Sequence, residues 1–239
     1  MVTVSLELGG PEASRASIEA ARPEHPSLLD ATHRMDVLFG VVNVPNVVWI
    51  DEQGIIVRPP EPGWPGKTQY PPEMLELLAE RAARDPETAS RRTDMMKKIG
   101  SGQDRASYPD AIRDWAVNGA ASRFAMTPGE VVDASRPRDV DRSCAAAHFE
   151  LANHLWRSGR RDLAIAHFNA CYRLDRDNWT YKRQAWSLVG SEQAGGGELS
   201  RFNQSPAPGS HADWPFDSDF DTDVAALGPG EYYPKTLTP

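Results

Sequence analysis

The chain has 239 residues, of which 40% are hydrophobic and 25% charged, and its formal net charge is −8. This length can hold one large domain or two small ones. The negative charge disfavours non-specific binding to nucleic acid, and no apolar run approaches the ~18–20 residues of a membrane-spanning helix. Two cysteines exclude a disulfide-rich scaffold. We therefore expect a soluble protein without a nucleic-acid partner or a membrane span.

The first part of the chain alternates strand and helix patterns. Residues 1–8 alternate apolar and polar side chains, as a half-buried strand does, and Gly9-Gly10-Pro11 ends the pattern. The residues that follow predict a helix, a short extended segment and a second short helix, over residues 12–21, 26–30 and 31–39.

A strand–turn–strand pattern comes next. Residues 46–50 are rich in β-branched and aromatic side chains and predict a buried strand. The turn residues 51–54 lead to a partner strand at 55–57. We expect Pro59 and Pro60 to end this strand, because proline cannot donate a hydrogen bond to a ladder. Together, these elements indicate an α/β arrangement.

The second part of the chain is predicted to be helical. Residues 59–72 hold six prolines and predict a linker or a long irregular loop. Apolar spacing and cap residues in the region 73–190 predict helices over residues 73–83, 86–99 and 108–117, and a short helix opening at 127–130.

Residues 145–178 resemble a tetratricopeptide repeat (TPR), a helix-turn-helix unit of about 34 residues. Cys171 and Arg176 depart from the pattern. One repeat cannot bury its own apolar face, so we expect the aromatic-rich residues 178–188 to form a capping helix. The apolar, small and turn positions are occupied by Leu151, Ala152, Leu155, Gly159, Ala164, Phe168 and Leu174.

The TPR-like hairpin has two interpretations. It is either an αα-hairpin within a helical domain that is not a repeat array or part of a peptide-binding groove. A groove requires exposed polar side chains on the concave face, and the candidates are Asn153, Arg157 and Asn169.

The stretch from Phe39 to Val57 resembles the second half of a thioredoxin-fold domain of the TlpA/ResA and peroxiredoxin-like group. A loop with a proline, an apolar strand ending in Ile-Asp, a glycine turn and a second strand carry the likeness. With the preceding elements it covers residues 2–58. The resemblance implies that Pro45 is the substrate-binding cis-proline and that the backbone of Val44 pairs with an extended substrate peptide. An ordinary trans proline and an unrelated α/β fragment remain alternatives.

The resemblance does not bring the catalytic residues of that family with it. The family's Cys-x-x-Cys motif supplies a reactive thiolate and a resolving thiol, and it precedes the region that matches here. Cys144 and Cys171 lie far outside that region. We therefore assign no catalytic residue and no cofactor, and we expect no oxidoreductase activity of the chain itself.

The missing half has a structural consequence in the thioredoxin fold. The absent strand would separate the strand at residues 2–8 from the strand at 46–50, leaving two unpaired edges. The two strands could pair directly, another chain could donate a strand, or the natural start could lie upstream, which a strand at residue 2 favours. No signal peptide is visible, so a cytoplasmic location is the default expectation.

Cys144 and Cys171 are predicted to lie at similar heights on the inward stripe of the hairpin. They are either two buried thiols that pack as small apolar side chains or a dithiol clip between the helices.

The remaining residues, 191–239, form an extended acidic and aromatic tail. Its acidic residues alternate but lack the glycine and glutamate of a calcium loop, so we expect a solvated stretch and no metal site. We expect this tail to dock through its aromatic side chains rather than fold as a domain. The acidic residues are Asp217, Asp219, Asp221 and Asp223, and the aromatic ones are Phe216, Phe220, Tyr232 and Tyr233.

Two functions remain open from the sequence. The chain is either a truncated or degenerate member of a thioredoxin-like redox family or an interaction protein that binds peptides through the Val44–Pro45 loop and the TPR-like helices. In both, the fold is a partial thioredoxin-like α/β module, residues 1–58, followed by helices.

Overall fold

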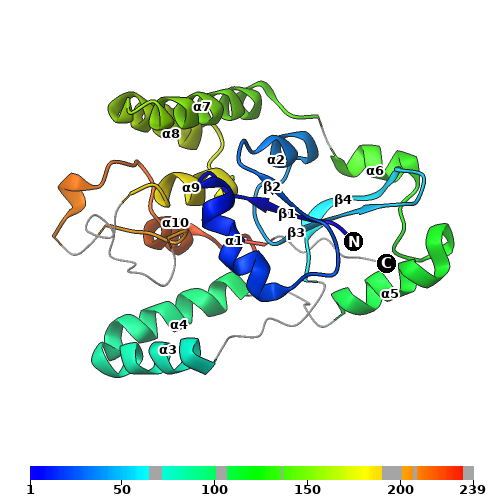
Figure 1. Ribbon diagram of the computed structural model, residues 1–239, viewed down its shortest axis with the longest axis horizontal. Helices are drawn as coiled ribbons and strands as arrows, with labels where there is room; N and C mark the ends of the chain where they lie inside the picture. Colours follow the sequence, from blue (N-terminus) through cyan, green and yellow to red (C-terminus); the bar gives the residue numbers. More distant parts are fainter. Residues whose placement is uncertain (65–71, 101–106, 136, 190–200, 207–208, 234–239) are drawn as a thin grey trace. The chain divides into compact units, whose positions relative to one another are not determined.

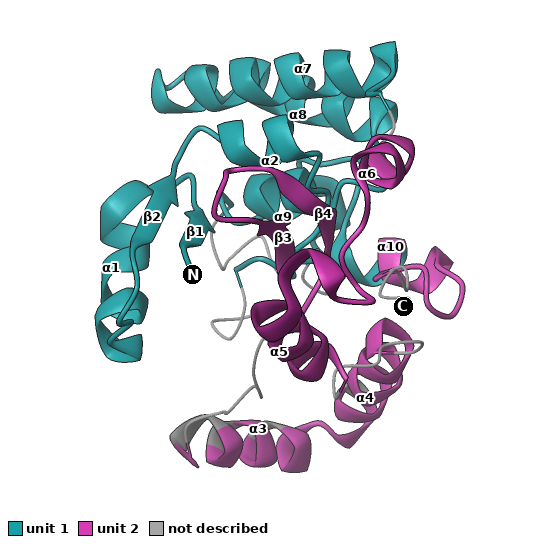
Figure 2. Cartoon of the chain, turned by 90° about the vertical axis from the view of Figure 1, so that its right-hand side faces the viewer, with its two compact units in different colours: residues 1–44, 136–222 teal, residues 45–135, 223–239 magenta. Residues whose placement is uncertain are grey.

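The computed structural model describes residues 1–64, 72–100, 107–135, 137–189, 201–206 and 209–233. The chain divides into two compact units, each built from two stretches of sequence (Figure 2). Unit 1 comprises residues 1–44 and 136–222, and unit 2 comprises residues 45–135 and 223–239.

Unit 1 begins with a small α/β element. Strand β1 (Thr3–Leu6) pairs in parallel with β2 (Ser27–Asp30), and helix α1 (Gly10–Ala21) connects them. Helix α2 (Arg34–Phe39) follows, and all four elements lie within a few residues of their predicted positions.

The rest of unit 1 is helical. Helices α7 (Val140–Arg157) and α8 (Arg161–Leu174) form an antiparallel hairpin, and α9 (Trp179–Trp186) follows them (Figure 1). The turn has a structural reason: Gly159 adopts a φ of 77°, and the Arg160 N–H donates to the carbonyl of Leu155 at 2.9 Å. This is a Schellman ending, which stops α7 and turns the chain toward α8.

Small residues hold the two helices of the hairpin together. Ala145, Ala152 and Ala164 are fully buried, so the α7 and α8 backbones approach closely without leaving cavities. The helical hairpin predicted from the sequence is therefore confirmed. Leu151 is 42% exposed, so its expected place on the packed stripe was wrong.

A side chain of α9 connects the helical part of unit 1 to its α/β part. The Gln184 side chain accepts a hydrogen bond from the Leu8 N–H at 3.0 Å and donates to the carbonyl of Leu6 at 3.1 Å. The Thr180 N–H donates to the carbonyl of Val42 at 3.2 Å. These bonds satisfy backbone groups that a two-stranded sheet leaves open.

Unit 2 contains an antiparallel strand pair and helices. The strands are β3 (Asn46–Ile50) and β4 (Ile56–Pro62). The helices are α3 (Pro72–Arg84), α4 (Pro86–Gly100), α5 (Tyr108–Asn118) and α6 (Pro128–Ser135), all close to their predicted ranges. Helix α10 (Phe220–Ala226) begins with the last residues of unit 1.

Strand β4 is longer than the sequence predicted, because it continues through Pro59 and Pro60 to Pro62. Trp49 pairs with Arg58 and Val47 pairs with Glu61, so the two prolines fall in an irregularity of the register. A bulge tolerates residues that cannot donate to the ladder. The expected end of the strand at Pro59 was therefore wrong.

A buried polar network stands at the centre of unit 2. The Arg58 guanidinium donates to Glu61 Oε1 at 2.8 Å and to the carbonyl of Phe124 at 2.7 Å. Trp49 Nε1 donates to the hydroxyl of Tyr108 at 3.0 Å. Burial raises the pKa of Tyr108 well above its usual range, so the hydroxyl stays protonated. The network fixes β3, β4 and α5 against one another.

The structure is thus a mixed arrangement of small α/β elements and many helices, as the sequence predicted at that level. Strand β1 pairs with β2, and strand β3 pairs with β4. Among the described helices, none is long and apolar enough to cross a membrane.

Candidate functional site

The loop singled out by the sequence is already engaged within the chain. Val44 and Pro45 are exposed, but the Val44 N–H donates to Asn43 Oδ1 at 2.9 Å. The Val44 carbonyl accepts from the Arg183 guanidinium at 3.5 Å. A substrate peptide would have to replace both contacts, and the role of this loop stays a prediction.

The two cysteines are free thiols in different surroundings. Cys171 is buried, and burial, followed by the charges of Asp175 and Asp36, raises the pKa of its thiol. Cys144 is exposed, so its expected place on the inward stripe was wrong. The physical reason is the helix phase: α7 buries Ala145 and Phe149, and Cys144 falls outside that stripe.

The clearest site-like feature of unit 1 is formed by its own tail. Residues 214–220, here called the tail segment, lie against a surface that we call the α8–α9 face. The residues of the α8–α9 face are Phe168, Asn169 and Arg173 of α8 and Trp179 and Trp186 of α9.

Asn169 binds the backbone of the tail segment with both ends of its amide. Its Nδ2 donates to the carbonyl of Pro215 at 3.1 Å, and its Oδ1 accepts from the Asp217 N–H at 2.9 Å. One side chain therefore satisfies an acceptor and a donor two residues apart, as a neighbouring β-strand would.

Two aromatic side chains anchor the tail segment. Phe216 is 8% exposed and meets the ring of Phe168 edge-on, with centroids 6.1 Å apart. Phe220 is 6% exposed and meets the rings of Trp179 and Trp186, with both centroid distances at 6.4 Å. The prediction that the tail docks by its aromatic side chains is confirmed for these residues.

Polar contacts fix the stretch between the two anchors. Trp186 Nε1 donates to the carbonyl of Ser218 at 3.1 Å, and Trp214 Nε1 donates to the same carbonyl at 2.9 Å. The guanidinium of Arg173 forms an ion pair with Asp217. Asp217 is therefore engaged, and the expectation of a fully solvated acidic stretch was wrong at this position.

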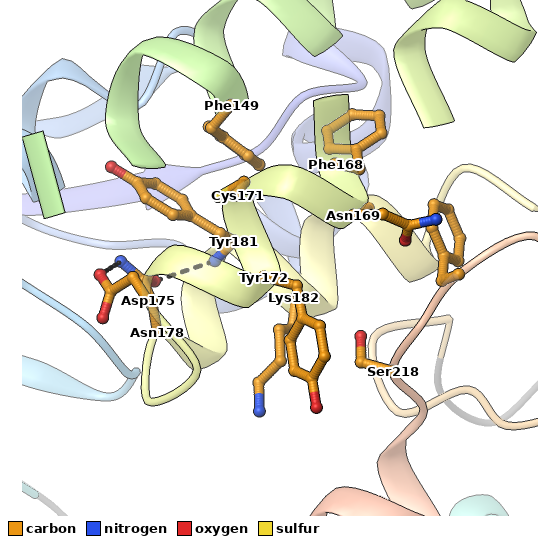
Figure 3. Close-up of a pocket in the computed structure, with 12 residues that line it drawn as sticks. Phe149, Phe168, Asn169, Cys171, Tyr172, Asp175, Asn178, Tyr181, Lys182 and Ser218 are labelled. Atoms are coloured by element: carbon orange, nitrogen blue, oxygen red, sulfur yellow. Dashed lines mark hydrogen bonds between the residues drawn. The ribbon is translucent and has the colours of Figure 1, made fainter. Parts of the chain in front are cut away.

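A small pocket lies under the tail segment (Figure 3). The cavity measures about 10 Å³, room for about one water molecule, so it is no preformed site for a small ligand. Lys182 lines it, with Nζ 3.6 Å from the centre of the Trp179 ring. In Figure 3, Asn169 projects from α8 on the side where the chain carrying Ser218 passes.

One acidic side chain of this pocket is held by its neighbours. Burial raises the pKa of Asp175, whereas a hydrogen bond from Asn178 and the charge of Arg142 oppose this. The Asn178 amide caps α9 by accepting from the Tyr181 N–H at 3.1 Å (Figure 3). These groups position α9 relative to α8 rather than offer chemistry to a ligand.

A second cluster in unit 1 is the buried pair of His33 and Asp36. His33 Nδ1 lies 2.7 Å from Asp36 Oδ2, and the ring of His33 packs edge-on against Phe149, with centroids 5.0 Å apart. Burial raises the pKa of Asp36, although the contact with His33 opposes the shift. The pair has the residue types of an acid–base dyad, but both side chains are wholly buried and cannot reach a substrate.

The described residues hold no group of three or more His, Cys, Asp or Glu side chains placed to bind a metal ion. His148 and His167 face each other across the hairpin, with their Nδ1 atoms 2.8 Å apart. Two imidazoles without a third ligand do not make a metal centre.

We found no family model, no curated protein and no solved structure that matches this chain. The sequence had named Asn169 as a candidate for binding, and the structure places it at the centre of the α8–α9 face. Arg173 and Trp186 were missed, because their partners lie 32 or more residues away along the chain and no local pattern connects them.

Proposed function

We propose that unit 1 is a protein-interaction module and that its α8–α9 face binds an extended segment of polypeptide. The two-way contact between Asn169 and the backbone of residues 215–217 carries this proposal. A side chain that hydrogen-bonds to backbone groups binds a polypeptide segment whatever its sequence. Selectivity then comes from the two aromatic sockets, by which we mean the surfaces of Phe168 and of Trp179 with Trp186 that hold Phe216 and Phe220. The TPR-like pattern of residues 145–178 supports the same function, because helical repeats of that kind commonly form extended binding surfaces.

The redox alternative rests on a different region. The motif over residues 39–57 supports a thioredoxin-like ancestry with Pro45 as its surviving site residue. Cys171 is a buried thiol of raised pKa and Cys144 stands alone at the surface, so neither supports thiol–disulfide exchange by this chain. Membership of that family therefore remains a second proposal, without an oxidoreductase activity attached to it.

The experiment measures binding to the full chain after its own tail segment has been released. The double variant Phe216→Ala/Phe220→Ala removes both anchors, and a fluorescent peptide of residues 212–222 is then added in solution. Fluorescence anisotropy should report saturable binding to this variant. If the folded variant does not bind the peptide at any concentration up to the millimolar range, the proposal is wrong.

Asn169→Leu in the same background tests the observation itself. It removes two hydrogen bonds and leaves backbone groups of the peptide unsatisfied, which costs about 1.5–3 kcal/mol, or about 10–150-fold in affinity. The matched control is Ala166→Ser, on the exposed side of α8, which should leave the affinity unchanged. Equal affinities for the two variants would remove Asn169 from the site.

A further inference from the structure

The tail segment is the occupant of the α8–α9 face in this chain, and its chemistry defines what else can bind there. We propose that this segment is an intramolecular competitor, and that the external partner is a segment with two aromatic side chains four residues apart and an acidic side chain directly after the first of them. This inference rests on the proposed function and adds the partner's chemistry and the regulation of the site.

The spacing of the anchors follows from the two aromatic sockets. Phe216 enters the socket beside Phe168, and Phe220 enters the socket between Trp179 and Trp186. The chain bends at Asp217, between the two anchors, and the anchors contact different helices, Phe216 the α8 helix and Phe220 the α9 helix. A partner must therefore carry both aromatic groups at this spacing to fill both sockets.

One charged contact of the face selects a side chain of the partner. Arg173 forms an ion pair with Asp217, and the buried ammonium of Lys182 lines the pocket beneath the segment. Asp217 is the carboxylate of the tail segment that meets the Arg173 charge, whereas Asp219 accepts a hydrogen bond from the Thr222 N–H at 2.9 Å. The Arg173 guanidinium therefore favours an acidic side chain at the position of Asp217 and disfavours a basic one there.

The contacts at the edge allow the tail segment to leave. The side chains of Arg173 and Asp217 are 56% and 46% exposed, so their ion pair is screened by salt and contributes little. The tethered segment nevertheless competes at an effective concentration on the order of millimolar. A free peptide of the same sequence should therefore bind the intact chain much more weakly than it binds a chain whose segment has been released.

The test compares wild type with Phe216→Ala/Phe220→Ala, using the labelled 212–222 peptide and both full-length proteins. We expect at least tenfold tighter binding to the double variant. The control His211→Ala changes an exposed tail residue outside the segment and should bind as weakly as wild type. If wild type and the double variant bind the peptide equally well, the tail segment does not compete, and the proposed function still stands. If neither protein binds the peptide, both the competition and the proposed function are wrong.

Exchanging the charges of Arg173 and Asp217 tests the competition by the tail segment while Phe216 and Phe220 stay in place. Asp217→Lys should loosen the tail segment without altering the face, and adding Arg173→Glu should restore the closed state, so binding of the labelled peptide rises in the first variant and falls back in the second. A peptide in which lysine replaces Asp217 should bind the double Phe variant several-fold more weakly, because the attraction to Arg173 becomes a repulsion. If the lysine peptide or a scrambled peptide binds as tightly, the stated partner chemistry is wrong.

The molecular mass in solution decides whether the competition is intramolecular. Light scattering on wild type should give a monomer at the concentrations used for binding. A stable dimer that Phe216→Ala/Phe220→Ala converts to a monomer would mean that the segment comes from a second copy, and it would overturn the intramolecular assignment.

Discussion

His33 and Asp36 form a hydrogen-bonded pair with no exposed side-chain surface, at the start of α2. His33 adopts a φ of 58°, a left-handed conformation that is uncommon for a residue with a side chain. This strained backbone directs the imidazole inward against Phe149 and Tyr181. The pair thereby connects the α/β part of unit 1 to its helices.

Removing one member of this pair should be costly. His33→Ala leaves the Asp36 carboxyl group buried without its imidazole, and we expect a loss of about 3–5 kcal/mol in the free energy of unfolding. The double variant His33→Ala/Asp36→Ala should lose less than the sum of the single variants. Urea unfolding followed by circular dichroism measures these values, and strict additivity would show that the two side chains do not interact.

The histidine pair of the hairpin should make stability depend on pH. Burial first, and then the electrostatic effect of the neighbouring His167 and Arg173 side chains, lower the pKa of His148. The folded state therefore favours the neutral ring. This contribution to stability is complete above about pH 6.5, the unfolded pKa, and is lost as pH falls through the lower folded pKa.

Thermal unfolding at pH 7.5, 6.5 and 5.5 measures this effect. The melting temperature of wild type should fall more between pH 6.5 and 5.5 than that of His148→Gln, in which position 148 cannot titrate. Other groups titrate in both proteins, so the difference between the two curves is the quantity to compare. Parallel curves would remove His148 from the pH response.

Gly63 should not tolerate a side chain. A Cβ atom at this position would lie 2.5 Å from Cζ of Tyr108, whose hydroxyl accepts the indole hydrogen bond of Trp49. Gly63→Ala must therefore displace a buried ring, and we expect a cost of about 1–3 kcal/mol. Gly129→Ala is the matched control, because no atom beyond its chain neighbours and the backbone of its own helix lies within 4 Å of the added methyl group. Chemical denaturation compares both variants with wild type, and equal stabilities would contradict the close approach.

The two thiols should differ sharply in reactivity. Cys144 is exposed, whereas Cys171 is buried and has a raised pKa, so an alkylating reagent should modify one thiol in the native protein and two in denaturant. Mass spectrometry of the intact protein counts the modified groups. If mild oxidation removes both thiols and a reductant restores them, Cys144 and Cys171 can form a disulfide. That result would contradict their placement as one exposed and one buried thiol.

The sequence predicted helices well because the signals that begin and end them are local. Pro86 and Gly159 mark their boundaries through backbone geometry that neighbouring residues do not change. Strand β4 was predicted too short because its bulge depends on pairing with β3, which lies outside the strand itself. The phase of α7 was misjudged at Cys144 because apolar side chains occur on more than one side of that helix.

The candidate site was predictable only in its parts. Asn169 and the aromatic residues of the tail were recognisable by residue type, since polar side chains on a helical hairpin and aromatic side chains in an acidic tail both favour binding. That Asn169 and Phe216 belong to one site could not be predicted, because 46 residues separate Asn169 from Pro215 and no periodicity relates the two.

Unit 1 also has an order of assembly imposed by synthesis. Leu6 and Leu8 bind the Gln184 side chain across 178 and 176 residues, so the first segment of this unit leaves the ribosome long before its partner exists. Such distant contacts slow folding, because the chain must close a large loop before they form. While residues 45–135 are being synthesised, the backbone groups of Leu6 and Leu8 that later bind Gln184 have no partner, and the sheet edge can pair with other chains. Aggregation at this stage is avoided if synthesis is fast or if a chaperone covers the edge.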